Sequence, residues 1–111
     1  TKLLNHFNIT SHKGITVTCP GFYAPQGRKL RYELTNAKWI DALTQFHFKN
    51  HRVTNFEMET AGIYGMGNIL GHQCLSLSLI VANRITRQFS SNYHKLMDNL
   101  IRHTLEKAET L

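Results

Sequence analysis

Residues 52–71, RVTNFEMETAGIYGMGNILG, carry the pattern that decides the fold. The stretch opens with β-branched and aromatic side chains through Phe56, which favours a short strand. Helical spacing follows from about Thr60, and Gly71 stands where a C-terminal cap is expected. A strand therefore passes directly into a helix. The residues of this helix that we predict to face inward are Ile63, Met66 and Leu70.

Two further strands are expected on either side of this unit. Residues 15–19, ITVTC, are rich in β-branched side chains and predict a strand that ends at a proline and a glycine. Residues 75–82 form the most apolar stretch of the chain and predict a strand buried on both faces. Between the first strand and the next helix, residues 20–31 hold both prolines and several polar side chains, which indicates a loop.

Three further helices are expected. Residues 1–9 have helical spacing. Thr35 or Asn36 can cap a helix, and Ser90 or Ser91 can cap the last one. The apolar face of the middle helix comprises Trp39, Ile40, Leu43 and Phe46. The apolar residues that recur along the last helix are Tyr93, Met97, Leu100, Ile101, Leu105 and Ala108.

Helices and strands therefore alternate along the whole chain. This alternation predicts a layered α/β/α fold with a mostly parallel or mixed sheet. Its length of 111 residues predicts a single domain over 1–111. Ligands of such folds bind beyond the carboxyl ends of the strands. The strand ends to inspect therefore follow Cys19, Phe56 and Ala82.

The balance of charges limits the class of partner. Lys and Arg total 13 against 7 Asp and Glu, which gives a formal net charge of +6. Such a charge favours either an anionic partner, such as nucleic acid or phosphate, or a subunit whose acidic complement lies elsewhere. Because the basic residues are scattered and no RNA-binding or single-strand-binding pattern accompanies them, we expect no nucleic-acid partner.

The positions of the cysteine, histidine and apolar residues bear on two properties, the cellular compartment of the protein and whether it binds a metal. Cys19 and Cys74 make no disulfide framework, and no secretory signal or membrane-spanning stretch is visible, so we expect a cytoplasmic protein that does not contact a membrane. The seven His residues form no pair at helical ligand spacing with a carboxylate between them. We therefore expect no metal site.

Two carboxylates flank a methionine where the strand of residues 52–56 meets its helix. Glu57 and Glu59, on either side of Met58, can each accept hydrogen bonds from adjacent hydroxyls, so a sugar diol is a natural partner. Two alternatives remain open. Glu59 can simply favour the positive N-terminus of the helix while Glu57 points to solvent. The two residues can also form a glycosidase-type carboxylate pair.

The other two strand ends carry further candidate groups. Gln26 offers a donor and an acceptor for the edge of a nucleobase, and Arg28 offers a fork of donors for a developing oxyanion. Phe22 can pack against a planar ring. The alternative for this segment is a proline-anchored surface turn with a solvated arginine. After the third strand, Val81 provides an apolar wall and Arg84 a further guanidinium, so the three strand ends together would line one pocket.

These segments resemble motifs of the nucleoside phosphorylase superfamily, and most closely its uridine phosphorylase branch. EMETA at residues 57–61 resembles the family's Glu-Met-Glu-Ser-Ala signature, which follows a strand and opens a helix. FYAPQGR at residues 22–28 resembles the pyrimidine-recognition loop, usually Phe-Tyr-Pro-Gly-Gln-acidic-Arg. VANR at residues 81–84 is similar to the Val-Asn-Arg that closes the base pocket. The motifs occur in the family's order, and the likeness runs from about Gly14 to the end.

The resemblance implies reversible phosphorolysis, in which a pyrimidine nucleoside and phosphate give the free base and a pentose 1-phosphate. Catalytic roles are implied for Arg28, which would face O4 of the base and stabilise its negative charge, and for Glu59, which would bind the ribose hydroxyls. Gln26 would hold N3 and O2 of the base. The other implied substrate-binding residues are Phe22 and Val81 beside the base, Met58 beneath the sugar, Glu57 assisting Glu59, and Arg84 behind Arg28 and Gln26. No metal or organic cofactor is implied.

The sequence departs from the family pattern at several points, and these departures affect the substrate and the portion of the fold that we expect. Ala24-Pro25 replaces Pro-Gly before Gln26. Asn83 stands where purine-specific relatives and nucleosidases usually carry a proton-donating Asp, which favours pyrimidines. The family's phosphate-binding loop and arginines belong to an N-terminal half. We therefore expect the chain to be the C-terminal portion of an incomplete phosphorylase fold, inactive alone, whose full-length parent assembles through dimers.

Three alternatives to the pyrimidine phosphorylase remain open. The first is a purine phosphorylase or a nucleosidase of the same superfamily. The second is a non-catalytic basic domain that binds nucleic acid or a protein, and its affinity would fall steeply with salt. The third is a degenerate relative that keeps the fold without the chemistry.

Overall fold

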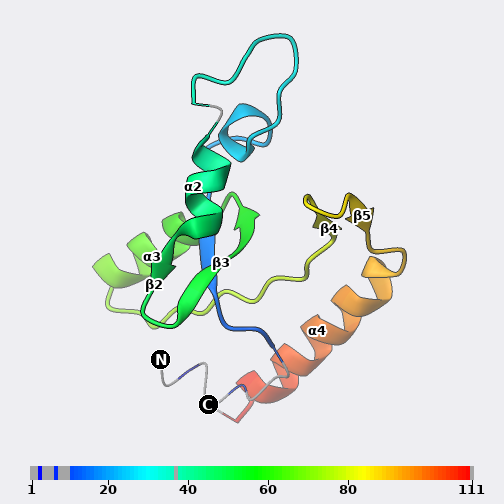
Figure 1. Ribbon diagram of the computed structural model, residues 1–111. Helices are drawn as coiled ribbons and strands as arrows, with labels where there is room; N and C mark the ends of the chain where they lie inside the picture. The colour runs from blue at the N-terminus through cyan, green and yellow to red at the C-terminus, as the bar shows by residue number, and fades with distance from the viewer. Residues whose placement is uncertain (1–2, 4–6, 8–10, 37, 111) are drawn as a thin grey trace. The chain divides into compact units, whose positions relative to one another are not determined.

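The computed structural model describes residues 3, 7, 11–36 and 38–110, and it confirms a mixed α/β class (Figure 1). The chain divides into two compact units, Ser11–His72 and the combination of Thr1–Thr10 with Gln73–Leu111. Each unit is described by itself. The helix expected over residues 1–9 falls mostly outside the described residues, and the single domain over 1–111 stays a prediction.

A small mixed sheet organises the unit Ser11–His72. Its central strand β3 (His51–Glu57) pairs in parallel with β1 (Ile15–Thr18) and antiparallel with β2 (His47–Phe48) (Figure 1). Both strands expected in this unit are therefore confirmed, and β2 is an addition that the sequence pattern did not indicate. The hairpin between β2 and β3 turns through Lys49, whose φ is 53°.

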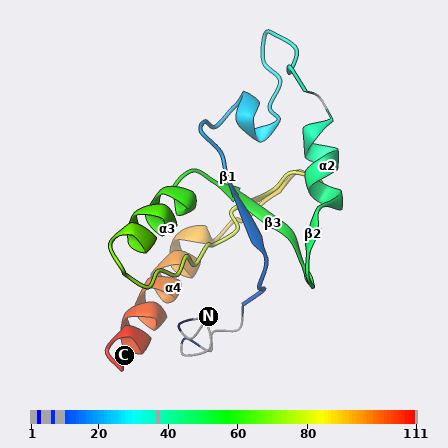
Figure 2. The ribbon, with the colours of Figure 1, turned by 90° about the vertical axis from the view of Figure 1, so that its left-hand side faces the viewer.

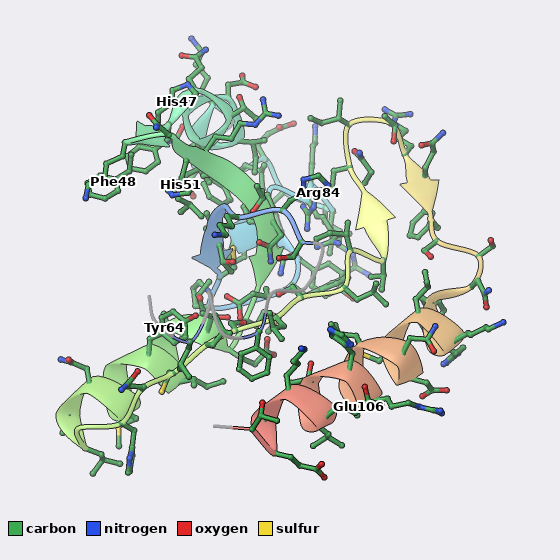
Figure 3. The ribbon with its side chains drawn as sticks, turned by 90° about the horizontal axis from the view of Figure 1, so that it is seen from below. His47, Phe48, His51, Tyr64, Arg84 and Glu106 are labelled. Atoms are coloured by element: carbon green, nitrogen blue, oxygen red, sulfur yellow. The ribbon has the colours of Figure 1, made fainter. Side chains whose placement is uncertain are left out.

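Side chains gather around the β2–β3 hairpin. His47, Phe48 and His51 are all exposed there, and the Lys49 ammonium lies 5.6 Å from the centroid of the Phe48 ring (Figure 3). Register places His47 opposite Arg52 and Phe48 opposite His51. The hairpin therefore presents a basic and aromatic surface at the edge of the sheet, away from the carboxyl ends of β1 and β3.

Helix α2 (Trp39–Gln45) packs against the sheet through an aromatic contact. The Trp39 ring meets Phe56 of β3 edge to face, with 5.8 Å between ring centroids. The predicted caps of this helix are wrong, because the helix begins after Lys38 and has no side-chain cap. Asn36 instead accepts a hydrogen bond from the backbone N–H of Lys38 at 3.2 Å and so shapes the turn before the helix.

Helix α3 (Thr60–Ile69) begins where β3 ends, as predicted. Its C-terminus is also confirmed: Gly71 has a φ of 74°, and the N–H of His72 bonds to the carbonyl of Gly67 at 2.7 Å, which is a Schellman motif. The prediction of inward-facing residues is wrong. The buried positions are Thr60 and Gly67, two turns apart on one face. The residues expected to face inward, Ile63, Met66 and Leu70, are all exposed.

The first turn of α3 lies close to β1. The backbone N–H of Ala61 is within hydrogen-bond distance of the Thr18 hydroxyl, at 2.9 Å. Such a close approach leaves little room for a large side chain between this turn and the strand.

The second unit contains a hairpin and a long helix. Strands β4 (Ala82–Asn83) and β5 (Gln88–Phe89) pair antiparallel, and α4 (Tyr93–Ala108) follows. The strand predicted over 75–82 is wrong, because within this stretch only Ala82 belongs to a strand. Its predicted burial on both faces is also wrong, since Ile80 and Val81 are exposed.

The last helix begins after Asn92, which makes no side-chain capping bond, so the predicted caps Ser90 and Ser91 are wrong. Much of its apolar surface is open. The exposed large side chains of α4 are Tyr93, Leu96, Met97, Ile101 and Leu105. Among the described residues, no helix has both the length and the apolar character needed to cross a bilayer.

The loop after β1 contains a short 3₁₀ helix, Ala24–Gln26, with Pro25 in its first turn. It closes on Gly27, which has a φ of 74° and bonds back to the Ala24 carbonyl at 2.9 Å. A Cβ at Gly27 would lie 2.6 Å from Cγ1 of Ile40. Both the left-handed backbone and the approach of α2 therefore require glycine at this point.

Replacing Gly27 by Ala is expected to lower the free energy of unfolding by roughly 1–3 kcal/mol, because the substitution combines a left-handed alanine with overpacking against Ile40. Urea denaturation of the 111-residue chain measures it. Gly62→Ala is the control, since nothing lies within 4 Å of its added Cβ in α3 and it should stabilise by up to about 1 kcal/mol. Equal stability of the Gly27→Ala variant and the parent chain would contradict the requirement for glycine at position 27.

Candidate functional site

Two of the predicted site segments leave the same end of the sheet. Because β1 and β3 are parallel, the loop after β1 and the turn before α3 both start at their carboxyl ends (Figure 2). The N–H of Cys19 bonds to the carbonyl of Glu57 at 2.8 Å and continues the ladder to the point where the segments diverge. The first two predicted strand ends are therefore neighbours.

The loop after β1 brings three predicted site residues into direct contact. Arg28 donates from Nη1 to the backbone carbonyl of Phe22 and to Oε1 of Gln26, the latter at 2.8 Å. The guanidinium carbon also lies 3.7 Å from the centroid of the Phe22 ring, which is a cation–π arrangement. Both hydrogen bonds use one nitrogen of a group that carries five N–H donors. Arg28 can therefore keep its place in the loop and still donate to a ligand.

The backbone of this loop holds Gln26 and Arg28 together. The N–H groups of both residues bond to the carbonyl of Tyr23 at 3.0 Å. Gln26 is 5% exposed, so little of its side chain is open to solvent. Phe22 is half exposed and also meets Tyr23 edge to face, at 5.3 Å between centroids. The turn formed with Ala24-Pro25 thus keeps Gln26 and Arg28 side by side.

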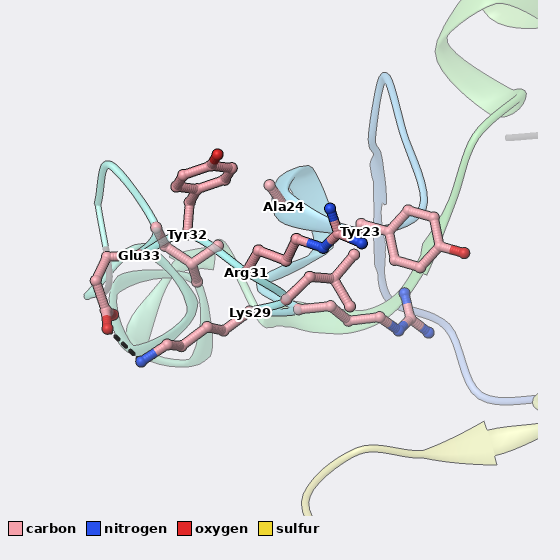
Figure 4. A pocket seen from close by; sticks show the side chains of 9 residues that line it. Tyr23, Ala24, Lys29, Arg31, Tyr32 and Glu33 are labelled. Carbon is pink, nitrogen blue, oxygen red and sulfur yellow. Dashed lines mark hydrogen bonds and ion pairs between the residues drawn. The ribbon is translucent and has the colours of Figure 1, made fainter.

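A cavity of about 720 Å³ lies beside the same loop, and Figure 4 shows the side chains that line it. It is lined by Tyr23, Ala24 and residues 28–34, and Lys29 pairs with Glu33 at its rim. Of the predicted site residues, Arg28 is the one among its lining residues. The cavity therefore adjoins the loop cluster from the side of Arg28.

Glu57 anchors the turn that opens α3. Its Oε1 accepts a hydrogen bond from the Thr18 hydroxyl, and its Oε2 accepts from the backbone N–H groups of Glu59 at 2.7 Å and Thr60 at 2.5 Å. The alternative in which Glu57 points freely to solvent is therefore wrong. Both carboxylate oxygens are engaged inside the protein, at the positive end of the helix.

Hydrogen bonding controls the charge of Glu57. Burial on its own would raise the pKa of its carboxyl, but the bonds from Thr18, from the backbone of Glu59 and Thr60 and from the Thr60 side chain hold the pKa at about 2, against an ordinary 4.5. Glu57 is therefore ionised throughout the physiological range.

Glu59 and Met58 are exposed beside this anchor. Glu59 is the N-cap residue of α3, yet its side chain does not cap the helix. Its Oε2 instead accepts from the backbone N–H of Met58 at 2.9 Å. The alternative in which Glu59 favours the positive N-terminus of the helix stays open. The two neighbouring carboxylates differ in their bonds: both oxygens of Glu57 accept bonds within the protein, whereas the bond described for Glu59 uses one.

The third predicted segment lies in the other unit. Val81 is exposed and its carbonyl accepts from the N–H of Ser90 at 3.0 Å, next to the β4–β5 hairpin. The Asn83 Oδ1 accepts from the N–H groups of Ile85 and Thr86, at 3.0 and 3.2 Å, and so holds the turn that contains Arg84. The part that Val81 and Arg84 would play in a shared pocket stays a prediction.

Comparison with known proteins decides the family. The family model described as "Phosphorylase superfamily" matches residues 1–108. The chain belongs to the phosphorylase superfamily. It is also 37% identical over 84 residues to the uridine phosphorylase of Thermococcus kodakarensis, which covers 73% of this chain and 28% of that protein. The chain thus matches little more than a quarter of the length of this relative. No solved structure gives a significant match.

For this member of the phosphorylase superfamily, one structural participant was missed by sequence reasoning. Thr18 bonds to Glu57 and to the first turn of α3, although the two strands that bring it there are 39 residues apart. The sequence of the strand did indicate that Thr18 could take part, because Thr16 and Thr18 alternate with Val17 and their side chains therefore share one face of β1. The residues of β3 that lie opposite them depend on the register between the two strands, and the spacing of residues in one sequence does not give this register.

Replacing Glu57 by Gln is expected to destabilise the chain by about 1 kcal/mol at pH 7, because the amide keeps one acceptor oxygen of the two and its bonds are no longer charge-assisted. Since the folded pKa lies below the ordinary value, ionised Glu57 stabilises fully above pH 4.5, and this contribution disappears as the pH falls towards 2. The variant should lose that part of the acid dependence in thermal unfolding measured between pH 2 and 7.

Glu33→Gln is the matched control, because it removes an exposed pair with Lys29 and should change stability by less than about 0.5 kcal/mol. An unaltered pH profile in Glu57→Gln would contradict the assignment of this acid dependence to Glu57.

Proposed function

We propose that this chain supplies the base- and pentose-binding residues of an enzyme that catalyses the reversible phosphorolysis of a pyrimidine nucleoside such as uridine. In this reaction the glycosidic C–N bond breaks, its electron pair goes to the base, and a phosphate oxygen forms the new bond to the pentose carbon. Membership of the phosphorylase superfamily and the identity to a uridine phosphorylase support the proposal. Phosphate is the co-substrate, bound by parts outside this chain, and no metal or organic cofactor takes part.

One observation carries the proposal. Phe22, Gln26 and Arg28 form a contact cluster on the loop after β1, and Glu59 is exposed on the turn after β3. Both segments leave the same end of a parallel strand pair. A planar base with carbonyl oxygens suits the first group, and a vicinal diol suits the second. A nucleoside joins these two chemistries in one molecule.

The proposed roles come from the resemblance to the family, and the described contacts support those of Gln26 and Arg28. Arg28 donates to the base oxygen on which negative charge develops as the glycosidic bond breaks, and it is the main electrostatic stabiliser of the leaving group. Gln26, held against Arg28 at 2.8 Å, reads the neighbouring edge of the base. Glu59 accepts hydrogen bonds from the ribose hydroxyls, with Met58 beneath the sugar. Phe22 and Val81 flank the base, and Arg84 supports Arg28 and Gln26.

Asn83 bears on the choice between pyrimidine and purine substrates. An amide cannot supply the proton that an Asp at this position would give to a purine leaving group. Asn83 also uses its side-chain oxygen to hold the β4–β5 turn, through the N–H groups of Ile85 and Thr86. Because a carboxylate could accept the same two bonds, the hairpin itself does not demand an amide. The amide therefore supports a pyrimidine substrate.

The reaction is tested with the full-length enzyme, by chromatography of the base released from uridine with and without phosphate. We expect uracil to appear only when phosphate is present. Equal release without phosphate would show hydrolysis, and preference for inosine or adenosine over uridine would support the purine alternative. The 111-residue chain alone is expected to release little base under either condition.

Replacing Arg28 by Ala in the full-length enzyme is expected to lower kcat on uridine by roughly 10²–10³-fold, the usual effect of removing a donor from a developing oxyanion. Arg52→Ala is the control, because Arg52 is exposed on the hairpin side of β3 and should keep the parent rate. Steady-state kinetics at saturating phosphate measures both variants. A rate within twofold of the parent for Arg28→Ala would remove Arg28 from the mechanism.

A further inference from the structure

We propose that Thr18 and Glu57 act as a clamp that positions Glu59 for the pentose, so that both are positioning residues and Glu59 alone of the two carboxylates binds the sugar. This inference rests on the proposed function for the identity of the ligand. The clamp itself rests on the hydrogen bonds of the described residues.

The Thr18 hydroxyl uses both of its hydrogen-bonding capacities. A hydroxyl has one proton to donate and lone pairs to accept. It donates to Oε1 of Glu57, which as a carboxylate can only accept, and it accepts at 2.9 Å from the N–H of Ala61, which can only donate. The direction of each bond is therefore fixed by the chemistry of the partner. One side chain at the end of β1 holds both the carboxylate after β3 and the first turn of α3.

Together, Thr18 and Glu57 satisfy the N-terminus of α3. The first N–H groups of a helix have no partner inside it. Here Glu59 and Thr60 donate to Oε2 of Glu57, and Ala61 donates to Thr18. Capping is thus performed by the preceding strand and by its neighbour in the sheet. The side chain at the N-cap position, Glu59, is relieved of this task.

Because Glu57 bonds to the first N–H groups of α3 and Glu59 does not cap the helix, the two carboxylates differ in how available they are to a ligand. Both oxygens of Glu57 accept hydrogen bonds within the protein, so binding a diol would require at least one of those bonds to break. Glu59 is exposed, and the bond described for its side chain is to the N–H of its neighbour Met58. A ligand that reaches the turn therefore meets Glu59 as the available acceptor, at a position set by the clamp.

The test compares Thr18→Val, which keeps the shape and removes the hydroxyl, with Thr18→Ser, which keeps the hydroxyl. Thr16→Val is the matched control, because Thr16 donates to Asn55 across the same two strands at 2.9 Å without touching the turn. The side-chain carboxyl of Glu57 is titrated by carbon-13 NMR in the 111-residue chain. Steady-state kinetics on uridine is measured in the full-length enzyme at saturating phosphate.

We expect Thr18→Val to raise the titration midpoint of Glu57 by about one pH unit, because a bond to the charged form is lost. It should also raise KM for uridine tenfold or more. Thr18→Ser should restore both values, and Thr16→Val should leave both unchanged. A merely structural role for Thr18 would lower stability and move this midpoint without raising KM.

Two results would overturn the proposal: a Glu57 midpoint that stays the same in Thr18→Val, or a midpoint that moves while KM does not. If the parent enzyme does not act on uridine, the proposed function fails, and the titration still decides whether the clamp exists.

Discussion

The parallel pairing of β1 with β3 is the constraint on which the rest of the described site depends. It brings Thr18 opposite Glu57, although the two residues are 39 positions apart in the chain. Because parallel strands end at the same edge, the loop that holds Gln26 and Arg28 and the turn that presents Glu59 start beside each other. A different register would send the Thr18 side chain to the other face of the sheet and leave the first turn of α3 without its partner.

Burial in the unit Ser11–His72 is concentrated on the segments that carry the candidate site. Its most buried side chains are Cys19, directly after β1, Gln26 in the following loop, and Thr60 at the start of α3. Much of the large apolar surface of α3 lies outside, as it also does on α4 of the other unit. Gln26 is therefore both one of the buried side chains of the unit and a candidate site residue. Open apolar helix faces fit a partial phosphorylase fold, which the comparison with a longer relative also indicates.

Local patterns in the sequence predicted the local structure well. The β-branched run of β1, the passage from β3 into α3 and the glycine that ends α3 each depend on neighbouring residues, and all three are confirmed. The 75–82 strand failed because apolar composition does not determine whether a segment pairs within a sheet. The inward residues of α3 were predicted from apolar character and spacing, whereas the buried positions are Thr60 and Gly67, which this pattern did not indicate.

The types of side chain in the sequence also predicted part of the candidate site. The contact among Phe22, Gln26 and Arg28 follows from their place in one short loop. The different hydrogen bonds of Glu57 and Glu59 could not be predicted, because those of Glu57 depend on a hydroxyl from another strand. The predicted caps of α2 and α4 are wrong because polar residues precede each helix, yet neither helix has a side-chain cap. Val81 and Arg84 await a test of their roles.

The stacking of Arg28 on Phe22 has a consequence for how tightly a ligand can be held. An arginine on an open surface loses the freedom of several side-chain torsions when it grips a ligand, and that loss opposes binding. Here the guanidinium is already fixed by an aromatic face, a backbone carbonyl and the Gln26 amide. Most of the entropic penalty is therefore incurred during folding, and preorganisation leaves more of the interaction energy of Arg28 available for affinity.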